Sequence, residues 1–129
     1  MARRPRPSAL LALAALLSSV AASAIAQEDG ERIFQRCFSC HSVDPAEQNL
    51  SGPNLHGVVG RRAATLPEFE YSDAMRAAGG AGLVWTPEIL DRYLADPEDF
   101  LPEGRMAGVR LRDPAQRRVL IEWLAGRSR

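Results

Sequence analysis

Residues 37–41 read Cys37-Phe38-Ser39-Cys40-His41, and the rest of the chain is best understood from these five positions. Two cysteines separated by two residues occur in redox disulfides, in zinc sites and in covalent haem attachment sites. A zinc site needs further ligands, and beside His41 the only other histidine or cysteine is His56. A thioredoxin-like disulfide belongs in a βαβ unit, and no credible strand borders this motif.

The histidine directly after the second cysteine favours haem attachment over both alternatives. At this spacing the two thiols can form thioether bonds with the two vinyl groups of one haem. His41 is then placed to coordinate the iron from the proximal side. The motif therefore predicts one haem c, attached covalently through Cys37 and Cys40.

The first 26 residues have the pattern of a secretory signal peptide. Three arginines precede residues 9–22, which are almost entirely alanine and leucine, and Ala24-Ile25-Ala26 offers a cleavage site. We expect export to the periplasm, cleavage after Ala26 and a haem domain over residues 27–129. The alternative is an uncleaved membrane anchor, because residues 9–26 reach the lower limit of roughly 18 residues for a span.

Length and composition allow one ordinary domain: 129 residues, 46% hydrophobic and 25% charged. Three of the sixteen basic residues lie in the first 26 positions, where there is no acidic residue. The remaining chain holds thirteen basic and sixteen acidic groups, a net charge of −3. An acidic domain is a poor nucleic-acid binder, so we expect no nucleic-acid partner, and we expect a monomer. Every basic residue is arginine.

Outside the motif, capping signals predict short helices joined by long loops, hence an all-α fold. Such a domain has too little apolar helix surface to pack alone, so we expect the haem to fill its centre. The expected elements are a helix within 29–40, a loop over 44–66, a helix from Ser72-Asp73 that fades at 79–82, a helix from Thr86-Pro87 to about Ala95, one turn from Asp96-Pro97, and a helix from Asp113-Pro114 to Gly126.

The chain resembles the class I c-type cytochromes, close to mitochondrial cytochrome c and its soluble bacterial relatives. The resemblance implies short helices and loops around one haem, with the N- and C-terminal helices crossing at Gly30 and Phe34 against Leu120 and Trp123. The matching stretches, in the order of the family, are Gly30–Phe34, Cys37–His41, Gly52–Gly57, Gly60-Arg61, Tyr71–Asp73, Trp85-Thr86, Tyr93-Leu94, Pro97, Pro102, Met106 and Leu120–Leu124.

The resemblance also implies the two axial ligands of the iron. His41 matches the proximal ligand and Met106 the distal one, a thioether that favours ferrous iron and raises the reduction potential. Pro53 matches the residue whose carbonyl accepts a hydrogen bond from His41. Tyr93 matches the tyrosine whose hydroxyl approaches the methionine sulfur.

Three further matches concern the buried haem propionate. Arg61, Tyr71 and Trp85 match the residues that hydrogen-bond this carboxylate, which needs donors when it is buried. Other candidates receive plainer interpretations. We expect Met75 to be core near the distal pocket, His56 to be a surface or structural residue, and the pair Arg117-Arg118 to lie on the solvated face of the last helix.

These features predict a soluble electron carrier, not an enzyme, because six-coordinate iron leaves no position for a substrate. The resemblance implies a quinol-oxidising membrane complex as donor, and a terminal oxidase or photosynthetic reaction centre as acceptor. It also suggests Arg36 and Arg105 as docking residues. The alternatives are a subunit bound permanently to a periplasmic dehydrogenase, and a peroxidase or gas sensor with an open iron site.

Overall fold

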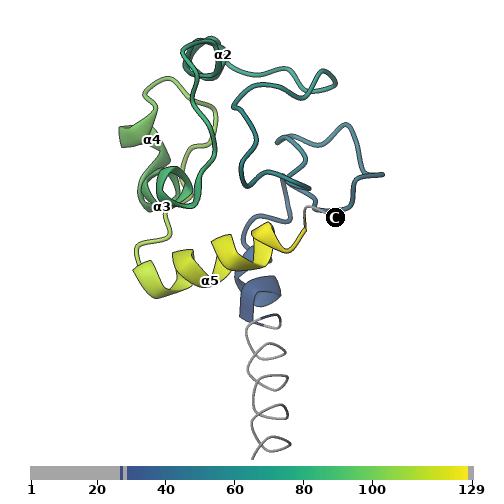
Figure 1. The fold of residues 1–129 in the computed structure, drawn as a ribbon, viewed down its shortest axis with the longest axis vertical. Helices are drawn as coiled ribbons and strands as arrows, with labels where there is room; N and C mark the ends of the chain where they lie inside the picture. Colours follow the sequence, from purple (N-terminus) through teal and green to yellow (C-terminus); the bar gives the residue numbers. More distant parts are fainter. Residues whose placement is uncertain (1–26, 28, 128–129) are drawn as a thin grey trace, which may run out of the picture.

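The computed structural model describes residues 27 and 29–127, and the expected signal peptide lies outside these residues. Residues 29–34 are helical and are followed by α2 (Asp73–Gly80), α3 (Pro87–Ala95), α4 (Pro97–Phe100) and α5 (Pro114–Ala125), as Figure 1 shows. In the described part of the chain, β pairing is limited to one isolated antiparallel bridge between Arg62 and Val84. The expectation of an all-α fold is confirmed. No helix among the described residues is long and apolar enough to cross a membrane.

Local capping chemistry sets where the labelled helices begin. In each case a side-chain oxygen just before the helix accepts a hydrogen bond from a backbone N–H of the first turn, which otherwise lacks a partner. Proline then occupies an early position of α3, α4 and α5, where no intrahelical donor is needed. The four capping residues are those expected from the sequence: Ser72, Thr86, Asp96 and Asp113.

Helix α2 ends at Gly80, within the stretch 79–82 where the sequence predicted it to fade. The Arg62 side chain explains why the helix still includes the two glycines. Its Nε donates to the carbonyl of Gly79 at 2.8 Å and its Nη2 to that of Gly80 at 3.3 Å. These tertiary bonds satisfy the last carbonyls of the helix and offset the low helix propensity of glycine.

The helix over residues 29–34 crosses α5, as the resemblance implied (Figure 1). The Phe34 and Trp123 rings lie 5.0 Å apart, and a Cβ added at Gly30 would fall 2.3 Å from Trp123 Cβ. Contrary to the apolar spacing, the helix ends at Phe34. Residues 35–40 form tight turns, in which Cys37 N–H donates to Phe34 O and Cys40 N–H to Cys37 O.

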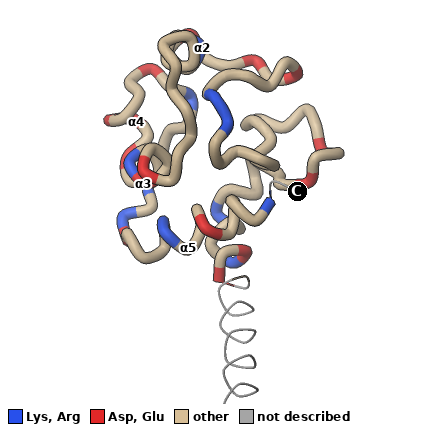
Figure 2. Tube along the Cα trace, in the orientation of Figure 1, with Lys and Arg blue, Asp and Glu red and all other residues tan. Residues whose placement is uncertain are grey.

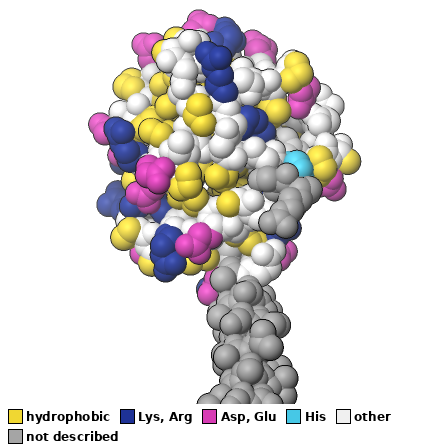
Figure 3. All heavy atoms as spheres, in the orientation of Figure 1, with side chains coloured by type: hydrophobic (Ala, Val, Ile, Leu, Met, Phe, Trp, Pro, Cys, Tyr) yellow, Lys and Arg dark blue, Asp and Glu magenta, His cyan; other side chains and the backbone are white. Residues whose placement is uncertain are grey.

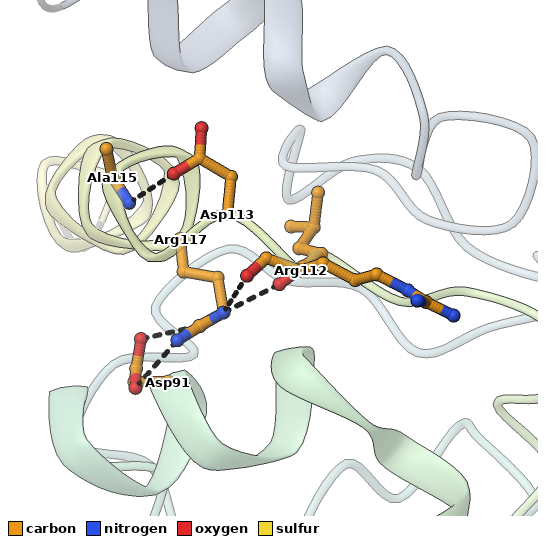
Figure 4. Close-up of polar contacts among 6 residues, drawn as sticks. Asp91, Arg112, Asp113, Ala115 and Arg117 are labelled. Atoms are coloured by element: carbon orange, nitrogen blue, oxygen red, sulfur yellow. Dashed lines mark hydrogen bonds and ion pairs between the residues drawn. The ribbon is translucent and has the colours of Figure 1, made fainter.

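Arg117 joins α5 to α3 (Figure 4). The prediction that its side chain lies on the solvated face of the last helix is wrong. Its side chain is only 11% exposed and pairs with Asp91 of α3 at 2.7 Å. Nη1 also donates to the carbonyls of Leu111 and Arg112, at 2.8 and 3.0 Å. The planar guanidinium can serve a carboxylate and two carbonyls at once, which makes this burial tolerable. Arg118 is 67% exposed, as expected.

Candidate functional site

The helices and loops surround one large cavity, and all nine site residues predicted from the sequence line it. Three of them lie together in residues 37–41, and the other six come from segments far apart in the chain that folding brings together. The nine residues are Cys37, Cys40, His41, Pro53, Arg61, Tyr71, Trp85, Tyr93 and Met106.

The two cysteines line the cavity, Cys37 buried and Cys40 exposed. Burial raises the pKa of the Cys37 thiol. Hydrogen bonds from Ser51 and Ser39 lower the pKa of the Cys40 thiol. The tight turns after Phe34 place both sulfur atoms on the same cavity, as attachment to one haem requires.

His41 is oriented by the backbone carbonyl of Pro53. The distance from His41 Nδ1 to Pro53 O is 2.7 Å, and because a carbonyl only accepts, Nδ1 is the protonated nitrogen. The lone pair is therefore on Nε2, available to a metal. Burial lowers the pKa of His41, which favours the neutral imidazole that metal coordination needs.

Gly52 lies directly against the imidazole ring of His41. A Cβ at this position would lie 2.5 Å from His41 Cε1 and 2.7 Å from Nδ1. Contacts this short force the ring or the backbone to move. This role of Gly52 was not predicted from the sequence, where the signal for it is a glycine directly before the carbonyl-bearing Pro53.

We expect Gly52→Ala to tilt the His41 ring and weaken its bond to Pro53. Overpacking of this kind should lower the free energy of unfolding by about 1–3 kcal/mol, and the changed ligand orientation should shift the reduction potential of the holoprotein. Denaturant unfolding and redox titration measure the two effects. Gly80→Ala is the control, since a Cβ there meets nothing within 4 Å. Wild-type values for both quantities in Gly52→Ala would show that the ring does not rest on Gly52.

A second wall of the cavity contains three residues with hydrogen-bond donor groups, Arg61, Tyr71 and Trp85. Arg61 donates to the carbonyls of His56 and Asn54, at 3.0 and 2.9 Å, and desolvation lowers its pKa. Within the described residues no carboxylate lies within 4.0 Å of it. Burial raises the pKa of the Tyr71 hydroxyl, which therefore stays protonated. Trp85 is 7% exposed, and its indole N–H forms no hydrogen bond within the described residues.

Arg61 and Trp85 fit the carboxylate of a buried propionate, since a desolvated cation without an anionic partner and a neighbouring N–H both favour an acceptor between them. The cysteine pair fits thioether attachment, and the neutral imidazole fits an iron ligand. The residues present therefore suit a haem. His56 does not line the cavity, and its backbone carbonyl accepts a hydrogen bond from Arg61.

The remaining wall carries two methionines and a tyrosine. Met106 is half-buried in the loop between α4 and α5, and Met75 is half-buried in the first turn of α2, where its N–H donates to Ser72 Oγ. Both line the cavity, so Met75 lies near the pocket as expected. Burial raises the pKa of Tyr93 to about 12, which keeps its hydroxyl a donor.

Comparisons with known proteins agree with this site. Residues 27–128 match the family model described as cytochrome c. Cytochrome c2 of Agrobacterium tumefaciens is 41% identical over 95 residues, which cover 74% of this chain and 86% of that protein. The structure of cytochrome c2 from Rhodospirillum centenum superposes with a TM-score of 0.75 at 38% identity, over 80% of this chain and 98% of that one. Ferricytochrome c2 from Rhodopseudomonas palustris gives 0.71 at 36%, over 78% and 97%.

Proteins of this family carry haem c on a cysteine pair and transfer electrons without turning over a substrate. Here the pair lines a cavity that also presents a neutral imidazole, a thioether and the donor-bearing side chains of Arg61, Tyr71 and Trp85. The family match spans nearly the whole described chain. This chain therefore belongs to the cytochrome c family, as an electron-transfer protein that binds haem c covalently through Cys37 and Cys40.

Proposed function

We propose that the chain is a soluble periplasmic electron carrier, which takes electrons from a quinol-oxidising membrane complex and gives them to a terminal oxidase or photosynthetic reaction centre. The observation that carries the proposal is that an imidazole and a thioether, His41 and Met106, line the same cavity. Two protein ligands complete the coordination of a haem iron, so no position is left for a substrate. The similarity to proteins named cytochrome c2 supports the same role.

In this proposal each lining residue has one task. His41 Nε2 and Met106 Sδ hold the iron, and Pro53 fixes the orientation of the imidazole through the 2.7 Å bond. Arg61, Tyr71 and Trp85 neutralise and hydrogen-bond a propionate. Tyr93 directs its hydroxyl toward the methionine. When bound, the haem supplies the Fe(III)/Fe(II) couple, and the surrounding side chains set its potential by ligation, burial and charge.

The periplasmic location is proposed from residues 1–26, which we expect to be a signal peptide cleaved after Ala26. Mass spectrometry of the exported protein tests this directly. A mature N-terminus at Gln27 with one haem attached supports the proposal. A chain that retains residues 1–26 in the membrane fraction would instead support the membrane anchor.

Absorption spectra of the oxidised and reduced holoprotein test the proposed function. We expect a weak iron–sulfur charge-transfer band in the ferric state and no rapid reaction of the ferrous state with carbon monoxide. Rapid carbon monoxide binding would favour a peroxidase or gas sensor, because it requires an open position on the iron. Purification with a stoichiometric enzyme partner would favour a dedicated dehydrogenase subunit.

The charge distribution predicts how electron transfer depends on salt. Acidic and basic residues are interspersed along the chain and over the face in Figure 3, so a local group of arginines must steer docking (Figures 2 and 3). Arg36 is exposed at the cavity and forms no ion pair among the described residues, and neighbouring Phe38 is 63% exposed. An exposed arginine beside an exposed apolar side chain suits a partner with acidic residues around its redox centre.

We therefore expect the second-order rate with such a partner to fall roughly tenfold or more between low and physiological salt, because exposed charges are screened. Stopped-flow kinetics over a range of salt concentrations measure this effect. Arg36→Ala should reduce both the rate at low salt and the steepness of its decline. Rates that stay flat or rise with salt would contradict a basic docking face.

A further inference from the structure

The side-chain amide of Gln27 lies against the C-terminal end of the domain. Two donors face the same amide atom: the indole Nε1 of Trp123 at 3.2 Å and Nη2 of Arg127 at 2.7 Å. Because an indole N–H and a guanidinium only donate, the atom between them is the amide oxygen. One carbonyl oxygen therefore accepts two hydrogen bonds, and one of them comes from a cation.

The surrounding fold holds both donors in place. Trp123 is only 5% exposed, and its ring lies 5.0 Å from that of Phe34. The Arg127 guanidinium lies over the Trp123 ring, 4.1 Å from its centroid, and the Arg127 carbonyl accepts a hydrogen bond from Gly57 N–H at 3.1 Å. Within the described residues no carboxylate lies within 4.0 Å of Arg127. Its positive charge is therefore directed to the Gln27 carbonyl without an acid to neutralise it.

This carbonyl belongs to a residue that can react with its own amine. Cleavage after Ala26 would give Gln27 a free α-amino group, whose nitrogen can attack the side-chain carbon Cδ to close a lactam ring. The N–Cδ bond forms while the C=O electron pair moves to Oε1, which becomes an oxyanion. The carbonyl then reforms, the Cδ–Nε2 bond breaks, and ammonia leaves with the proton lost by the amine. The products are pyroglutamate and ammonia, and no other reactant is consumed.

We propose that Gln27 is a modification site, which the folded protein itself converts to pyroglutamate, with Trp123 Nε1 and Arg127 Nη2 stabilising the oxyanion on Oε1. This inference rests on the proposed cleavage after Ala26, which supplies the amine. Donors already fixed at an atom that gains negative charge lower the barrier to such a step. The reaction also removes an ammonium group close to the Arg127 cation, and the lactam carbonyl remains an acceptor for both donors.

The modification would leave the mature chain without any primary amine. Every basic residue of the sequence is arginine, so the α-amino group of Gln27 is the one amine after cleavage. A free amine can coordinate haem iron when it loses its proton, and it is the group that aminopeptidases recognise. The cyclised N-terminus offers neither reaction.

Intact-mass spectrometry of the exported holoprotein follows the conversion as the loss of one ammonia. An amine-reactive dye gives a second readout, because it can label only the unmodified Gln27. The protein is purified in the cold after a short induction, then sampled over time at physiological temperature and pH 7. We expect Arg127→Ala to slow the conversion about tenfold, less than the loss of such a donor in a closed active site because Gln27 is exposed. Trp123→Phe, which keeps a ring but removes the N–H, should slow it to a similar extent.

Three controls separate the two donors from other effects. Arg118→Ala removes a charge from α5, where Arg118 is 67% exposed and pairs with Glu122, and it should convert like the wild type. Arg127→Lys keeps a cationic donor and should recover part of the rate. Guanidinium chloride unfolds the holoprotein without detaching the haem and separates both donors from Gln27, so the rate should fall as it does in Arg127→Ala.

Two outcomes would overturn the proposal. One is an equal extent of conversion in the wild type, Arg127→Ala and Trp123→Phe at every time point. The other is purified wild-type protein that keeps its free amine throughout the incubation, even if a fraction was converted in the cell. Failure of the proposed cleavage looks different: a chain that retains residues 1–26 has a larger mass and no α-amine on Gln27, and the inference falls with it.

Discussion

Replacing Met106 by alanine should leave the haem attached but abolish the iron–sulfur charge-transfer band and lower the reduction potential by roughly 0.1 V or more. Axial ligands set haem potentials over a range of about 0.8 V, and a neutral thioether stabilises ferrous iron. Water or another hard ligand at the vacated position would favour ferric iron. Covalent attachment through Cys37 and Cys40 does not depend on this side chain, so the haem should survive denaturing electrophoresis.

Met75 supplies the matched control, because it lines the same cavity but is fixed in the first turn of α2. Met75→Leu keeps the volume and removes the thioether, and the band and potential should stay near those of the wild type. Should the band persist in Met106→Ala and disappear in Met75→Leu, Met75 is the distal ligand. The redox titration and the near-infrared spectrum can be recorded on the same samples.

The second large effect is expected at the crossing of the terminal helices. In Gly30→Ala the new Cβ would lie 2.3 Å from Trp123 Cβ and 2.4 Å from Cγ. These atoms are next to the backbone of α5 and cannot rotate away, so the helices must separate and the Phe34–Trp123 contact at 5.0 Å must loosen. We expect a loss of about 1–3 kcal/mol or more in the free energy of unfolding.

Denaturant unfolding of the holoprotein, followed by far-ultraviolet circular dichroism, measures this loss. Gly80→Ala is again the control, because it makes the same change at a helical glycine with nothing within 4 Å of its Cβ. Removing a helical glycine there should be neutral or stabilising by up to about 1 kcal/mol. Equal midpoints for Gly30→Ala and the wild type would mean that the crossing is not as close as described.

The helix starts and the haem attachment motif could be predicted from the sequence because both depend on local chemistry. Ser72, Thr86, Asp96 and Asp113 were predicted as helix starts because each oxygen bonds a backbone N–H only two or three residues ahead. The haem motif is equally local, since Cys37, Cys40 and His41 lie within five positions. Neither inference requires knowledge of distant neighbours.

Other features depend on partners far along the chain, and for these the sequence was insufficient. The continuation of α2 through Gly80 depends on Arg62, 18 residues earlier. The burial of Arg117 depends on Asp91, 26 residues away, and the Arg105 contact depends on Glu70, 35 residues away. All sixteen basic residues are arginine, so residue type alone could not distinguish a buried connector from a docking charge.

Residue order therefore determined the helix starts and the attachment motif, because covalent spacing limits which atoms can meet within one turn. The other groups that line the cavity were predicted from the resemblance to the c-type cytochromes. Tertiary structure determined which arginine is buried, which glycine is in close contact and which carbonyl accepts a hydrogen bond from Arg105. An arginine side chain is long enough to reach several surfaces. Which carbonyl it meets is settled only when segments tens of residues apart come together.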